Sequence, residues 1–73
     1  MRGSIRRRTT MAEILDFDNI NDTNVTGILL GAGIHVSYAG VTLEQACRER
    51  GIDADVLLEA IQAYLRAEEK HRA

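Results

Sequence analysis

Apolar residues recur at helical spacing over the last third of the chain. The residues on this apolar face are Leu57, Leu58, Ile61, Tyr64 and Leu65. Charged and amide side chains occupy the opposite face, and Asp53 stands in front as an N-cap residue. The pattern predicts an amphipathic helix from Asp53 to about residue 70, with its apolar face turned to the rest of the protein.

A second helix is predicted immediately before it, because both of its ends carry local signals. Thr42 and Gln45 have the spacing of a capping box, and Val41 and Ala46 that of a hydrophobic staple. Gly51 ends the helix in a Schellman turn. The two helices together predict a helical hairpin in the C-terminal half.

The first half of the chain predicts two shorter helices. Thr10 and Glu13 form another capping box, and the helix that follows is expected to break within Asp16–Asp22, where Asp and Asn favour turns. Asn21 or Asp22 is expected to cap the next helix. Its apolar stripe is Val25, Ile28, Leu29 and Ala32, and Gly31 and Gly33 end it.

Residues 34–41 alternate between apolar and polar side chains, as a strand does. A strand needs a partner, and the sequence offers no second one. We therefore predict an extended loop whose residues Ile34, Val36 and Tyr38 pack inward.

These elements predict an all-α fold, a small bundle of three to four short helices that forms one domain over residues 11–73. The full chain has 73 residues, a length that allows only a modest core. The predicted core residues are Ile28, Leu29, Ile34, Val36, Leu43, Ala46, Cys47, Ile52, Leu57, Ile61 and Leu65.

Charge is distributed unevenly around a net charge of −2. Residues 1–10 contain Arg2, Arg6, Arg7 and Arg8 but no acidic residue. We interpret this segment as a basic, flexible N-terminal arm. The alternative is weak, salt-sensitive binding of nucleic acid or of an acidic partner through these arginines.

The hairpin has the outline of a helix-turn-helix, but its second helix has the wrong charge for DNA. Asp53, Asp55 and Glu59 occupy its N-terminal positions, where carboxylates repel phosphates. The sequence therefore predicts no DNA binding through this helix.

Candidate chemistry is sparse. A lone cysteine excludes a disulfide framework within the chain, and Cys47 occupies an inward position that favours a packing role. His35 lies in the loop, and the two residues are the weak candidates for a metal site. We predict no catalytic residues, no resident cofactor and a cytoplasmic protein without a membrane span.

Three segments carry a family resemblance: Gly33–Gly40 (GIHVSYAG), Thr42–Cys47 (TLEQAC) and Gly51–Asp53 (GID). They resemble the small N-terminal domain of repair-of-iron-centres (ScdA-type) proteins, and are similar to a related stand-alone helical domain with a Cys-rich loop. The resemblance implies a short helical bundle with a loop between its second and third helices. Ser37 and Tyr38 replace the family's adjacent cysteines, so the thiol chemistry of that loop is lost.

We therefore predict a non-catalytic interaction or accessory domain that binds a protein partner or forms a homodimer. The predicted contact residues are Tyr38, Leu58, Ile61, Tyr64 and Leu65. The alternative is a metal- or redox-linked accessory protein that binds iron or zinc through His35 and Cys47.

Overall fold

The computed structural model describes residues 5–36 and 38–72, with side chains as far as Lys70. It consists of α1 (Met11–Asn21), α2 (Val25–Gly31), α3 (Leu43–Arg50) and α4 (Ala54–Arg72), and no strand forms in the described ranges. The predicted all-α bundle is confirmed. The described helices include none that is long and apolar enough to cross a membrane.

The helix ends follow the local capping signals. The side chains of Thr10 and Thr42 each accept a hydrogen bond from the backbone N–H three residues on, and both capping boxes form. Gly51 closes α3 in the left-handed conformation, with φ at 70°. The Ile52 N–H donates to the Cys47 carbonyl (2.8 Å), which is the bond of a Schellman turn. Asp53 caps α4 by accepting from the Asp55 N–H (2.9 Å).

Helix α1 is longer than predicted. It does end within Asp16–Asp22, where the break was expected, but only at the last residues of that range: the helix continues to Asn21, and Asp22 adopts the left-handed conformation. Ile14 and Phe17 are buried on its inner face. Their burial outweighs the weak helix propensity of the Asp and Asn residues, most of which face outward.

The cap of α2 is also different from the prediction. Asn24, and not Asn21 or Asp22, is the N-cap, and its side chain accepts from the Gly27 N–H. Asp18 of α1 contributes a second cap from outside the helix. Its Oδ1 accepts from the Val25 N–H (2.7 Å), and its Oδ2 accepts from the Thr26 N–H (2.9 Å). One carboxylate of α1 thus holds the start of α2.

Residues 5–10, expected to belong to a flexible arm, pack against the helices. Ile5 is only 2% exposed and belongs to the hydrophobic core. The Leu43 N–H donates to the Thr9 carbonyl and the Glu44 N–H to the Arg7 carbonyl, both at 2.8 Å. The Gln62 side chain of α4 donates to the Ile5 carbonyl (3.2 Å). The segment therefore connects the start of α3 to α4.

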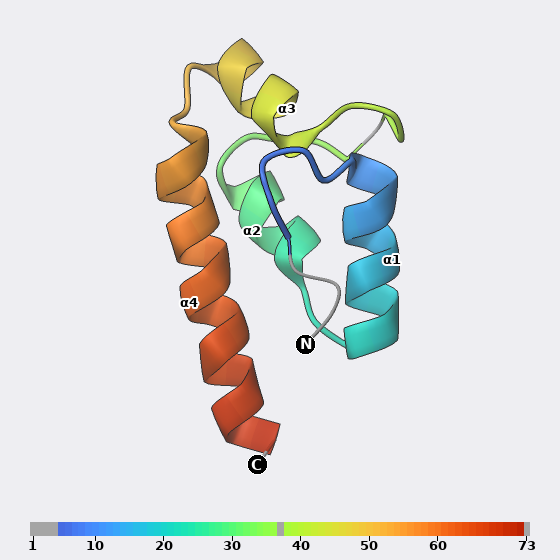
Figure 1. The fold of residues 1–73 in the computed structure, drawn as a ribbon, viewed down its shortest axis with the longest axis vertical. Helices are drawn as coiled ribbons and strands as arrows, with labels where there is room; N and C mark the ends of the chain where they lie inside the picture. The colour runs from blue at the N-terminus through green and yellow to red at the C-terminus, as the bar shows by residue number, and fades with distance from the viewer. Residues whose placement is uncertain (1–4, 37, 73) are drawn as a thin grey trace.

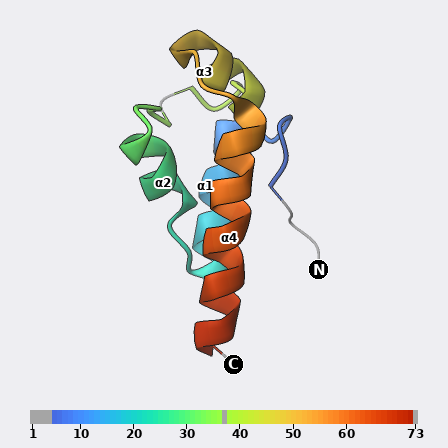
Figure 2. The ribbon, with the colours of Figure 1, turned by 90° about the vertical axis from the view of Figure 1, so that its left-hand side faces the viewer.

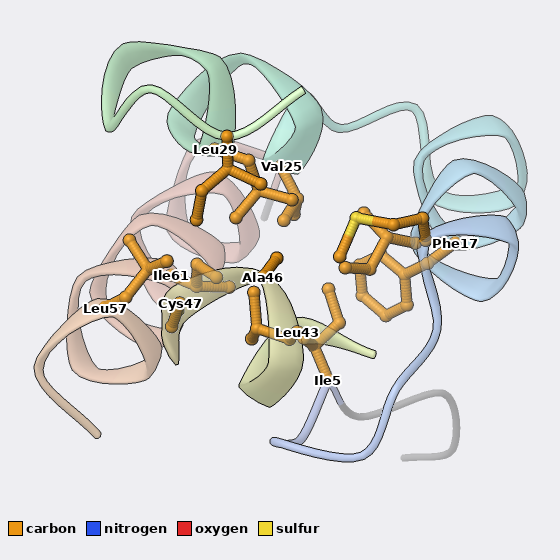
Figure 3. Packing of buried hydrophobic residues seen from close by; sticks show 12 residues of the cluster. Ile5, Phe17, Val25, Leu29, Leu43, Ala46, Cys47, Leu57 and Ile61 are labelled. Atoms are coloured by element: carbon orange, nitrogen blue, oxygen red, sulfur yellow. The ribbon is translucent and has the colours of Figure 1, made fainter. Parts of the chain in front are cut away.

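The core joins all four helices and the N-terminal segment (Figure 3). Leu29, Ile34, Leu43, Ala46, Cys47, Leu57 and Ile61 are buried as predicted. Ile28, Val36, Ile52 and Leu65 are only partly buried around this core. The prediction left out Ile5, Met11, Ile14, Phe17 and Val25, which are buried as well.

The elements form two packed pairs. α1 packs against α2, and α3 packs against α4. In Figure 1, α4 forms the left-hand edge of the molecule and α1 the right-hand edge, with α2 between them and α3 across the top. This arrangement places the 34–41 loop beside the beginning of α1 and the end of α3.

Candidate functional site

A pocket of about 370 Å³ opens beside the 34–41 loop. Buried residues form its apolar part: Met11 of α1, Ile34 of the loop and Ala46 of α3. The rim is polar and exposed, with His35 and Tyr38 from the loop and Glu49 and Arg50 from α3. A pocket with an apolar floor and a few polar groups at its rim is suited to receive an apolar side chain or a small ligand.

Backbone hydrogen bonds hold the loop over α1. The Met11 N–H donates to the Val41 carbonyl (2.8 Å) and the Ala12 N–H donates to the Ala39 carbonyl (3.2 Å). These bonds also satisfy two N–H groups at the start of α1, which have no partner within the helix. Ser37, predicted from the resemblance to stand in place of a cysteine, lies outside the described residues.

Tyr38 does not pack inward as predicted. It is 74% exposed, and the chain turns just after it, where the Val41 N–H donates to the Tyr38 carbonyl (3.1 Å). Strand-like alternation does not extend into a turn, so it does not set the direction of the Tyr38 side chain. The inward prediction is correct for Ile34 and, in part, for Val36.

The predicted contact residues of α4 are mostly used inside the protein. Ile61 is fully buried, and Leu58, Tyr64 and Leu65 pack partly against the core. The Tyr64 hydroxyl accepts a hydrogen bond from the Asn24 N–H (2.7 Å), which ties α4 to the start of α2. Of the five residues expected at an interaction surface, Tyr38 is the one that extends into solvent.

The arginines of the N-terminal segment lie apart from the loop pocket. Arg6 and Arg7 line a second, more open hollow against α4, together with Glu59 and Arg66. The Arg7 guanidinium lies 3.7 Å from the Asp55 carboxylate, and both side chains are exposed. Arg8 is exposed, and Arg2 lies outside the described residues. Asp55 and Glu59 lie beside this segment and offset part of its positive charge.

Cys47 has the environment of a packing residue. It is 1% exposed and lies beside Leu57 and Ile61 of α4 (Figure 3). Burial raises the pKa of the Cys47 thiol, and the Asp53 carboxylate raises it further. A protonated, enclosed thiol is a poor nucleophile and a poor metal ligand.

His35 and Cys47 do not share a site. His35 is exposed and lines the loop pocket, whereas Cys47 is not part of that lining. In the part of the chain that the structure describes, no group of three or more His, Cys, Asp or Glu side chains is placed to hold a metal ion. Binding of iron or zinc through this pair therefore has no geometric support here.

The raised pKa of Cys47 predicts how stability changes with pH. A thiol whose pKa is higher in the folded state stabilises that state fully below its unfolded pKa, and this contribution is lost as the pH rises through the folded value. The stability difference between wild type and Cys47→Ala should therefore shrink from about pH 8 to pH 10. Urea unfolding of both proteins at each pH measures it. A difference that stays constant over this range would contradict the assignment.

Comparisons with protein-family models, with curated proteins and with solved structures find no match to this chain. The resemblance to the repair-of-iron-centres domain stays a prediction. The function of the chain is therefore inferred from its own pocket, exposed side chains and hydrogen bonds.

Proposed function

We propose that the chain is a non-catalytic protein-interaction domain that binds a partner through Tyr38 and the adjoining pocket. The observation that supports this most is the 74% exposure of Tyr38 at the rim of a pocket with a buried apolar floor. Tyrosine is enriched at interface hot spots because it combines a large apolar area with a polar hydroxyl. In this arrangement the phenol packs on the partner while an apolar side chain of the partner enters the pocket.

Described residues before and after Tyr38 are held by the core and by α1, which favours tight contact. Ile34 anchors it in the core, and the carbonyls of Ala39 and Val41 bond to α1. A surface that is already ordered loses less conformational entropy when a partner binds. Arg50 and His35 at the rim add polar contacts that select the partner's orientation.

Site-specific photocrosslinking tests the proposal. A photoreactive residue replaces Tyr38 in cells that produce the protein, and the matched control replaces Ile20, which is 80% exposed at the far end of α1. We expect a defined covalent adduct from position 38 that position 20 does not give. Identical adducts from both positions, or none from position 38, would contradict the proposal.

A further inference from the structure

The N-terminal segment and α4 enclose a hollow that the proposed binding through Tyr38 does not use. The segment runs beside the first half of α4 (Figure 2). The hollow has a volume of about 630 Å³, and its apolar lining consists of the buried Ile5 and the partly buried Leu58. Arg6 and Arg7 of the segment and Arg66 of α4 stand at its rim. We call this site the arginine hollow.

One guanidinium group of the arginine hollow is paired within the chain, and two are not. The Arg7 guanidinium lies 3.7 Å from the Asp55 carboxylate, which offsets the charge at that end. Among the described residues, the side chains of Arg6 and Arg66 form neither an ion pair nor a hydrogen bond. Both side chains are exposed, so the hollow presents two guanidinium groups to solvent.

The backbone that carries these two arginines is held in place. The Ile5 carbonyl accepts a hydrogen bond from the Gln62 side chain (3.2 Å), and Arg66 follows Gln62 by one turn of α4. The Arg6 N–H donates to the Thr9 hydroxyl (2.8 Å). A guanidinium group donates two parallel hydrogen bonds to a carboxylate, and a fixed backbone reduces the entropy lost on binding. The arrangement therefore suits a ligand with carboxylate groups.

The two carboxylates of the lining decide between the classes of acidic partner. Asp55 and Glu59 lie on the α4 side of the hollow. A nucleic acid carries a negative charge on every phosphate, so these carboxylates repel part of a strand laid across the hollow. A peptide can place its carboxylates at the arginines and an apolar side chain on Leu58. The lining therefore favours a peptide with acidic and apolar residues over a nucleic acid.

We propose that the arginine hollow binds an acidic peptide segment of a protein partner. Carboxylates of the segment pair with Arg6 and Arg66, and an apolar side chain between them covers Leu58. This narrows the alternative indicated by the sequence, in which the N-terminal arginines bind nucleic acid or an acidic partner. The arginine hollow and the Tyr38 pocket share no lining residue, so either proposal can fail without the other.

NMR titration of the isotope-labelled full chain with short blocked peptides tests the proposal. The probe is Glu-Leu-Glu-Gly, and the matched control is Lys-Leu-Lys-Gly. We expect amide shifts at Arg6, Leu58 and Arg66 with the glutamate peptide and none there with the lysine peptide. Replacing the leucine of the probe with glycine should weaken binding, because the contact with Leu58 is lost.

Variants of the protein assign the binding to the arginine hollow. Arg6→Gln and Arg66→Gln should each raise the dissociation constant of the glutamate peptide about threefold, as the loss of one exposed ion pair does. Glu59→Gln should lower it, because a repelling carboxylate is removed. Arg48→Gln replaces an exposed arginine of α3 outside the hollow and should leave it unchanged. Circular dichroism verifies that each variant folds.

Four results would overturn the proposal. These are the absence of shifts at the hollow with the glutamate peptide, equal shifts with the lysine peptide, and an equal loss of affinity in Arg48→Gln and Arg66→Gln. The fourth is tighter binding of a thymidine oligonucleotide than of the glutamate peptide, which would make the hollow a nucleic-acid site.

Discussion

Replacing Ile5 with alanine is expected to lower the free energy of unfolding by about 2–5 kcal/mol. Ile5 is 2% exposed and packs into the core close to Leu43 (Figure 3). A domain of this size has a net stability of only about 3–5 kcal/mol, so much of the variant should be unfolded at room temperature. Urea unfolding followed by circular dichroism measures the change.

Arg8→Ala is the matched control for Ile5→Ala. Arg8 belongs to the same N-terminal segment but is exposed, so its replacement should change stability by no more than about 0.5 kcal/mol. If both variants unfold at the same urea concentration as wild type, the N-terminal segment is not part of the folded domain.

Removing the Asp18 carboxylate should have the second-largest effect. Asp18 accepts hydrogen bonds from the Val25 and Thr26 N–H groups and from the Thr23 hydroxyl. Asp18→Ala leaves the start of α2 without these acceptors, and we expect a loss of about 2–3 kcal/mol. Amide hydrogen exchange at Val25 and Thr26 should become faster.

Asp16→Ala controls for the change in charge on the same helix. Asp16 is exposed on α1, and alanine is the better helix former, so stability should stay the same or rise slightly. Equal losses from the two variants would show that Asp18 acts through the charge of α1 and not through the bonds to α2.

The sequence predicted the elements whose signals are local. Thr10, Thr42 and Gly51 each set a helix end within three or four residues, so capping rules were sufficient. The burial of Cys47 followed from its place on the inward face of α3. In these cases the interacting residues lie within one helical turn of each other or on one face of the same helix.

The prediction from sequence was wrong where the residues that contact a side chain are distant along the chain. Ile5 is buried in the core close to Leu43 of α3, and a run of arginines conceals this in the sequence (Figure 3). Asp18 resembles a helix breaker in the sequence, because its hydrogen bond with the start of α2 exists only in the folded protein. Alternation along the 34–41 loop suggested that Tyr38 faces inward, but a turn begins at Tyr38 and the strand-like alternation does not extend into it.

The candidate site was predicted only in part. Tyr38 was identified as a contact residue from its type and loop position, and its exposure supports that choice. The apolar face of α4 was assigned to a partner although the fold itself uses Ile61 and Tyr64.

The most direct test of the proposed function is the affinity of the protein for the partner captured at position 38. Titration calorimetry compares wild type, Tyr38→Ala and Ile20→Ala as folded proteins. We predict that Tyr38→Ala raises the dissociation constant at least tenfold, as the loss of an interface anchor does, while Ile20→Ala leaves it unchanged. Equal dissociation constants for wild type and Tyr38→Ala would contradict the account.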